Sequence, residues 1–148
     1  MDCAHALGAD VLCGPLHSAF KVFRGRGPVH DEFRRSADVL RSVAEHAAPA
    51  GVLLAPEALN RFECYLLNTM DGLSEHIDVI RHPNIRAMYD TFHANIEEKA
   101  PVEAFTRNLR NIVHVHISEN DRGVPGRGGS GVGRLRSPAA LSQSGQDG

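Results

Sequence analysis

Hydrophobic and polar residues repeat along this chain with two different periods. Between residues 31 and 48, apolar side chains recur every three or four positions, which predicts a helix with one buried face. Pro49 and Gly51 end that helix, and residues 52–57 (VLLAPE) then form a short apolar run typical of a buried strand. A helix followed by a strand indicates an α/β fold.

The same alternation continues on both sides of this unit. Residues 11–18 (VLCGPLHS) predict a strand that stops at a Gly-Pro turn, and further strands are predicted at 85–90 (IRAMYD) and 112–118. The two remaining helices are predicted at 68–81, with Asn68 or Thr69 as N-cap, and at 102–109. The polar segment TFHANIEE is expected to be a loop. About four strand-helix units in parallel order indicate a (β/α)8 barrel or a doubly wound sheet.

The strand predicted at 112–118 carries two histidines on one face. Strict alternation places Val113, Val115 and Ile117 on one side, and His114 and His116 on the other. A neutral imidazole is a good metal ligand, although a histidine on a strand is more often a core residue. We expect His114 to pack in the core, one layer deeper than His116.

Composition narrows the class of protein. The chain has 148 residues, of which 42% are hydrophobic, as expected for one ordinary globular domain. A formal net charge of -2 gives no electrostatic reason to expect nucleic acid or an anionic membrane as a partner. We expect a cytoplasmic protein. Cys3, Cys13 and Cys64 lack CxxC spacing, so they are expected to be reduced and structural.

Three ligand-type residues stand at the ends of successive predicted strands. Glu57, Asp90 and His116 each close a strand, and in a parallel barrel these ends meet at one mouth. Two carboxylates and an imidazole suit Mn²⁺, Co²⁺ or Mg²⁺. On spacing alone, the alternative is three unrelated polar residues at strand ends.

Three longer motifs carry a family resemblance. EALNRFECYLLNT (57–69), YDTFHANIEE (89–98) and HVHISENDRGVPG (114–126) resemble the ketose 3-epimerase family, the D-tagatose and D-psicose 3-epimerases among the xylose-isomerase-like TIM barrels. The resemblance implies a ketose substrate and a divalent metal, Mn²⁺ or Co²⁺ with Mg²⁺ as a third option.

The resemblance also assigns roles to individual residues. It implies that Glu57, Asp90 and His116 hold the metal, and that Glu57 is one of two catalytic acid/base groups. Glu63, His93 and Arg122 would contact the sugar hydroxyls. Proton transfer at C3 through an enediolate would need a carboxylate on each face of the carbon.

The sequence departs from this family at both ends. The resemblance corresponds to strands four to seven of eight, which implies a partial (β/α)8 TIM barrel at residues 1–126. The family places its second glutamate beyond the GxPGxG turn, whereas residues 127–148 contain no glutamate. These residues are rich in glycine and have no apolar period, which predicts a disordered or frame-shifted tail. We therefore expect this chain alone to be a weak or inactive isomerase.

Two other functions are left open. A non-catalytic barrel fragment would expose two unpaired strand edges, which favour aggregation or pairing with another chain. A metal-dependent endonuclease of the same barrel superfamily would need a basic face, and the charge of -2 argues against one. Assembly into a homo-oligomer and the identity of the sugar are not determined by the sequence.

Overall fold

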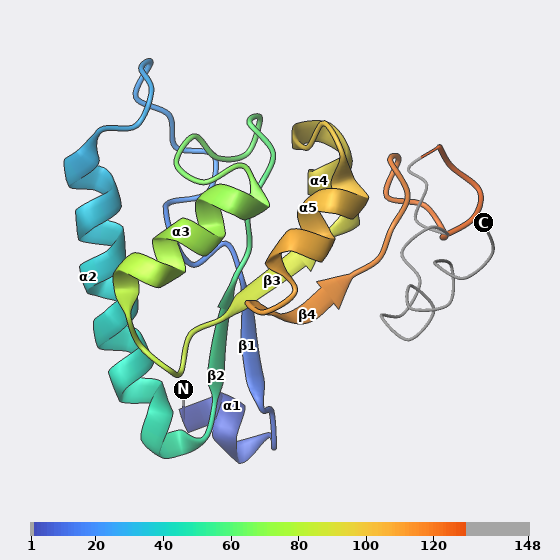
Figure 1. Cartoon of the computed structure of the whole chain (residues 1–148). Coiled ribbons are helices and arrows are strands. Elements are labelled where there is room, and N and C mark those ends of the chain that lie inside the picture. Colours follow the sequence, from blue (N-terminus) through green and yellow to red (C-terminus); the bar gives the residue numbers. More distant parts are fainter. Residues whose placement is uncertain (1, 130–148) are drawn as a thin grey trace, which may run out of the picture.

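Four parallel strands form the centre of the computed structural model, which describes residues 2–129 (Figure 1). They are β1 (Val11–Gly14), β2 (Leu53–Pro56), β3 (Ala87–Asp90) and β4 (Ile112–His116). β1 pairs with β2 and β3 with β4, and two single bridges join β2 to β3. Because the strand order follows the chain, the arrangement is that of a TIM barrel and not of a doubly wound sheet, whose order reverses at a switch point.

The longer helices cover one face of this sheet. Figure 1 shows α2 (His30–Ala47), α3 (Met70–Ile80) and α5 (Pro101–Asn108) beside one another. In this arrangement α3 lies between the other two helices and contacts both. A short helix, α1 (Asp2–Ala6), precedes β1, and the 3₁₀ turn η1 (Ala48–Ala50) follows α2. The partial barrel and its parallel strands are thus confirmed.

Alternation along the strands divides the side chains between two faces. Leu54, Ile85, Ala87 and Tyr89 point toward the helices and belong to the hydrophobic core. The helices contribute residues spaced by three and four positions, among them Leu40, Ala44, Leu73, Ile77 and Ile80. We call the opposite face of the sheet, which carries Glu57, Met88 and Asp90, the inner face.

Local signals explain where α3 begins and ends. The hydroxyl oxygen of Thr69 accepts a hydrogen bond from the backbone N–H of Gly72 at 3.2 Å, so Thr69 is the N-cap. Arg81 closes the helix in a left-handed conformation, with φ at 54°. The carboxylate of Glu98 also accepts from the backbone N–H of Met70 at 2.7 Å, which satisfies another free donor at the helix start.

One prediction is wrong. The segment TFHANIEE, expected to be a loop, forms the helix α4 (Thr91–Glu97) directly after β3. The carboxylate of Asp90 caps it by accepting from the backbone N–H of Phe92 at 2.7 Å. The buried residues of α4 are Thr91, His93 and Ala94, and two of these are polar. An apolar period was therefore not visible in the sequence.

Other expectations have definite outcomes. The three predicted helices are present within one or two residues of their expected bounds. Pro56 is the last residue of β2, where a missing backbone N–H disturbs the ladder least.

The three cysteines, Cys3, Cys13 and Cys64, are free thiols. No helix among residues 2–129 is long and apolar enough to cross a membrane. The predicted disordered tail falls largely on residues 130–148, outside the described residues.

Candidate active site

Two buried carboxylates lie side by side at the ends of β2 and β3. The exposed fraction is 9% for the side chain of Glu57 and 8% for that of Asp90. The backbone fixes Glu57 from both sides, because its N–H donates to the carbonyl of Gly14 and its own carbonyl contacts Nε2 of His17, each at 2.9 Å. Glu57 is therefore held firmly on the inner face.

The surroundings of Glu57 strongly disfavour its charge. Burial, followed by the neighbouring carboxylate of Asp90, raises the pKa of Glu57 to about 8, while Arg122 acts in the opposite direction. Two buried carboxylates that repel each other are what a divalent cation would neutralise. The residues present thus fit a metal of the oxygen-preferring kind.

His93 joins these carboxylates from α4. Its Nε2 atom lies 3.5 Å from Oε1 of Glu57 and 3.9 Å from Oε2 of Glu63. Its Nδ1 atom accepts a hydrogen bond from the backbone N–H of Asn60 at 3.0 Å. Burial is the main cause that lowers the pKa of His93 and favours the neutral ring. In a neutral ring whose Nδ1 accepts, the proton must be on Nε2, which faces the carboxylates.

That proton changes what His93 can do. Ligand atoms of Glu57, Asp90 and His93 lie within 4.8 Å of one another, so by distance alone these three could hold a metal. A protonated Nε2, however, has no lone pair to give to a cation and donates to an oxygen instead. The local chemistry therefore favours His93 as a hydrogen-bond donor over His93 as a ligand.

His116, the predicted third ligand, reaches the same carboxylates from β4. Its Nδ1 atom lies 3.8 Å from Oδ2 of Asp90, and 51% of its side chain is exposed. His116 is paired with Asp90 in the β3–β4 ladder, which places both side chains on the inner face. The structure thus brings His116 next to Asp90, with its imidazole half exposed.

Arg122 lies at the same mouth. Its Nη2 atom is 3.5 Å from Oε1 of Glu63, and its guanidinium stands 4.1 Å from the centroid of the Phe92 ring. The backbone of Arg122 has a φ of 60°, which is uncommon for any residue other than glycine. Glu63, His93 and Arg122 are therefore neighbours around the two carboxylates.

Sequence reasoning missed the residues that support these groups. Asn60 fixes the ring of His93, Phe92 supports Arg122, and His17 contacts the backbone of Glu57. Each of these contacts joins residues more than 25 positions apart in the sequence, so the local spacing of apolar residues does not reveal it. Glu119 was also missed: it is buried and accepts from the backbone N–H of Gly126 at 2.6 Å, in the loop that carries Arg122.

A separate groove of about 770 Å³ runs between α2 and α3, on the helix side of the sheet, and none of the site residues named above lines it. The groove is mostly apolar, and its two carboxylate residues, Asp38 and Glu75, are exposed. Chemistry and cavity volume therefore point to different places, and the buried carboxylates carry the stronger argument for a reaction centre.

Comparison with known proteins agrees with this architecture. The model of the xylose isomerase-like TIM barrel family matches residues 1–140. The chain belongs to this family. It is 40% identical over 125 residues to a D-psicose 3-epimerase of Ruminiclostridium cellulolyticum, an alignment that covers 84% of this chain and 43% of the relative.

Solved structures of family members superpose closely on the partial barrel. A structure of an L-ribulose 3-epimerase has a TM-score of 0.83 and 38% identity, and covers 86% of this chain and 43% of the other. The structure of a D-allulose 3-epimerase from Methylomonas sp. in complex with D-allulose has a TM-score of 0.84 and 28% identity, with coverages of 88% and 45%. The chain therefore spans less than half the length of these relatives.

Proposed function

We propose that this chain carries part of the active site of a metal-dependent ketose 3-epimerase. The observation that supports the proposal best is the meeting of two buried carboxylates, Glu57 and Asp90, with the Nε2 atom of His93. The relatives named above are 3-epimerases, and one is solved with a ketose. A ketose is accordingly the proposed substrate class.

In this proposal Glu57, Asp90 and His116 hold a divalent cation, Mn²⁺ or Co²⁺, with Mg²⁺ as a third option. When bound, the cation would stabilise the negative charge that develops on the substrate oxygens. The cation would also lower the pKa of Glu57, which is about 8 without a metal, and would thereby keep this carboxylate ionised so that it can accept a proton.

The remaining residues would bind and orient the sugar. The Nε2–H group of His93 donates to a substrate oxygen, while the Glu63 carboxylate accepts from a hydroxyl and Arg122 donates to one. Arg122 and Glu63 already hold each other at 3.5 Å, so both enter the site in a fixed orientation. Such preorganisation would orient the ketose for proton transfer between C3 and Glu57.

One chemical limit follows from the sequence. Inversion at C3 requires proton delivery from the face opposite to Glu57, and residues 127–148 contain no glutamate for that step. We propose that this chain by itself exchanges the C3 proton with solvent faster than it inverts C3.

Deuterium exchange tests both parts of the proposal. The chain is incubated with Mn²⁺ and D-fructose or D-tagatose in D₂O, and NMR follows both deuterium at C3 and the C3 epimer. We expect Mn²⁺-dependent exchange that exceeds epimer formation and is lost in Glu57→Gln. Glu45→Gln, on the exposed side of α2, is the matched control and should behave like the unaltered chain.

Either of two results would contradict the proposal. Absence of exchange with saturating Mn²⁺ would leave Glu57 without a role as base. Epimer formation as fast as exchange would show that a second acid/base group acts in this chain.

A further inference from the structure

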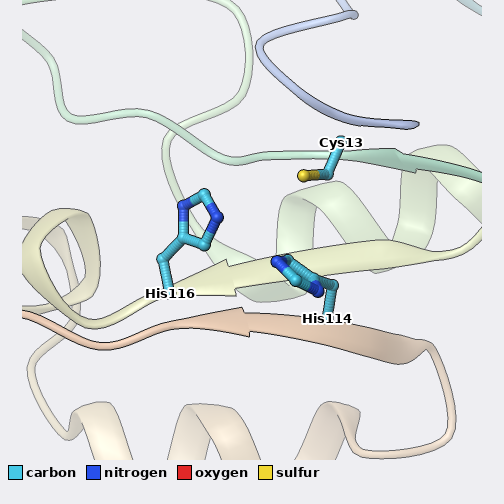
Figure 2. Close-up of side chains that lie close together, drawn as sticks. All are labelled: Cys13, His114 and His116. Carbon is cyan, nitrogen blue, oxygen red and sulfur yellow. The ribbon is translucent and has the colours of Figure 1, made fainter. Parts of the chain in front are cut away.

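A thiol and two imidazoles converge on the inner face beside the carboxylate site, and His116 belongs to both groups. Figure 2 shows the side chain of Cys13, from β1, directed toward those of His114 and His116, from β4. One ligand atom from each of the three residues lies within 4.8 Å of the other two. No local sequence pattern connects Cys13 with β4.

The convergence depends on the curvature of the sheet. β1 and β4 are the outer strands of the four, separated by β2 and β3. In a flat sheet, neighbouring strands about 4.8 Å apart would place these outer strands about 14 Å from each other. The barrel-like curvature brings Cys13 across the inner face to His114 and His116 (Figure 2).

One thiolate and two imidazoles form a donor set for a borderline or soft ion. Zn²⁺ binds sulfur at about 2.3 Å and imidazole nitrogen at about 2.0–2.1 Å, with tetrahedral geometry, so its donor atoms lie roughly 3.3–3.6 Å apart. Small side-chain rotations would close the present separations. Mg²⁺ and Mn²⁺ prefer oxygen donors and would not favour this set.

The three side chains are also reachable from solvent. Cys13 and His114 are half-buried and the side chain of His116 is half-exposed, so an ion has a path of entry. The two imidazole rings stand 5.0 Å apart, centroid to centroid, at an angle of 79°. The two rings are thus neighbours on the inner face, and one nitrogen of each lies within 4.8 Å of the thiol sulfur.

We propose that Cys13, His114 and His116 form a second cation site, which takes Zn²⁺ or Co²⁺ through a thiolate and two imidazoles. The proposal does not rest on sugar epimerisation, although it shares His116 with the carboxylate site proposed above. One imidazole cannot serve both centres in the same arrangement, so the two sites compete for His116. A fourth coordination position is left for water.

Cobalt spectroscopy of the full chain tests the proposal. Thiolate coordination to Co²⁺ produces a sulfur-to-cobalt charge-transfer band in the near ultraviolet, which carboxylate and imidazole ligands do not give. We expect this band to saturate at one equivalent of Co²⁺ and to disappear when Zn²⁺ is added. Absence of the band in the reduced, unaltered chain would overturn the proposal.

Substitutions of single residues show which cysteine supplies the thiolate ligand. Cys13→Ser and His114→Gln should each lower Zn²⁺ affinity at least about tenfold, because removal of supporting groups alone costs that much in known metal sites. Cys3→Ser, which removes an exposed thiol, and Glu57→Gln, which alters the carboxylate site, should keep the band. Loss of the band in Cys64→Ser instead, or its loss in Glu57→Gln, would overturn the assignment.

A measurement on the unaltered chain guards against misfolding of the variants. Iodoacetamide is applied with and without Zn²⁺, and mass spectrometry identifies the alkylated cysteines. Zn²⁺ should slow the alkylation of Cys13 and leave that of the exposed Cys3 unchanged. Equal alkylation of Cys13 in both conditions would contradict the proposal.

Discussion

The backbone N–H of Asn60 donates a hydrogen bond to Nδ1 of His93 at 3.0 Å. A backbone N–H can only donate, so Nδ1 must accept and the proton of the neutral ring is on Nε2. The ¹⁵N shifts and long-range couplings of the His93 ring should therefore show the Nε2–H tautomer. Because burial lowers its pKa, the ring should stay neutral to a lower pH than an ordinary imidazole. A ring protonated on Nδ1 would contradict this prediction.

The same hydrogen bond predicts which histidine, His93 or His116, binds the metal together with Glu57 and Asp90. If the Nε2 proton of His93 excludes that atom from coordination, His116→Gln should lower Mn²⁺ affinity at least about tenfold, and His93→Gln much less. Isothermal titration with Mn²⁺ measures both, with Glu45→Gln as control. The opposite order would show that His93, and not His116, completes the set with Glu57 and Asp90.

Arg122 should resist conservative replacement. Its planar guanidinium lies over the Phe92 ring and at the same time contacts the carboxylate of Glu63. A lysine ammonium cannot make both contacts. We expect Arg122→Lys to weaken ketose binding by about 1.5–3 kcal/mol, the range of one lost charged hydrogen bond. Ligand-observed NMR titration measures the change. Arg110→Lys, in an exposed ion pair with Asp78, is the matched control and should have no effect on sugar binding.

Two neighbouring positions of α3 should differ sharply in stability. Ile80 is fully buried against the sheet, whereas 58% of Val79 is exposed. Ile80→Ala leaves a cavity and should lower the free energy of unfolding by about 2–5 kcal/mol. Val79→Ala should change it by less than about 0.5 kcal/mol. Urea unfolding of both variants provides the measurement, and equal losses would show that the helix does not pack as described.

Acid should destabilise the fold through His76. Burial, with a smaller contribution from His17, lowers the pKa of His76 to about 4 from the ordinary 6.5. Between these two values the unfolded chain binds more protons, so stability decreases as pH falls from 6.5 toward 4 and is unaffected by this group above 6.5. The loss at pH 5 is on the order of 2 kcal/mol for this one group.

His76→Gln should therefore reduce the loss of unfolding free energy between pH 7 and pH 5, measured by urea unfolding at each pH. His17 has a similarly lowered pKa, so a smaller dependence should persist. His46→Gln, at an exposed position of α2, is the control. An unchanged pH dependence in His76→Gln would show that this imidazole is not held neutral in the fold.

Helices and strands with a regular spacing of apolar residues could be predicted from the sequence. The helix at 31–48 and the strand at 52–57 follow from the spacing of apolar residues, because a period of 3.6 or 2 indicates which side of the element faces the core. Glu57 and Asp90 were also predictable as neighbours, since parallel strands end at one edge. The helix α4 was not, because its buried face includes Thr91 and His93, whose partners come from other segments.

Local sequence patterns were therefore enough to predict the strands, the three longer helices and the carboxylates at the strand ends, since each depends on residues close together in the chain. The tautomer of His93, through Asn60, and the meeting of Cys13 with His114 and His116 depend on tertiary contacts. The physical reason is that hydrogen bonds and sheet curvature act between segments far apart in sequence. No local pattern of hydrophobic and polar residues encodes such contacts.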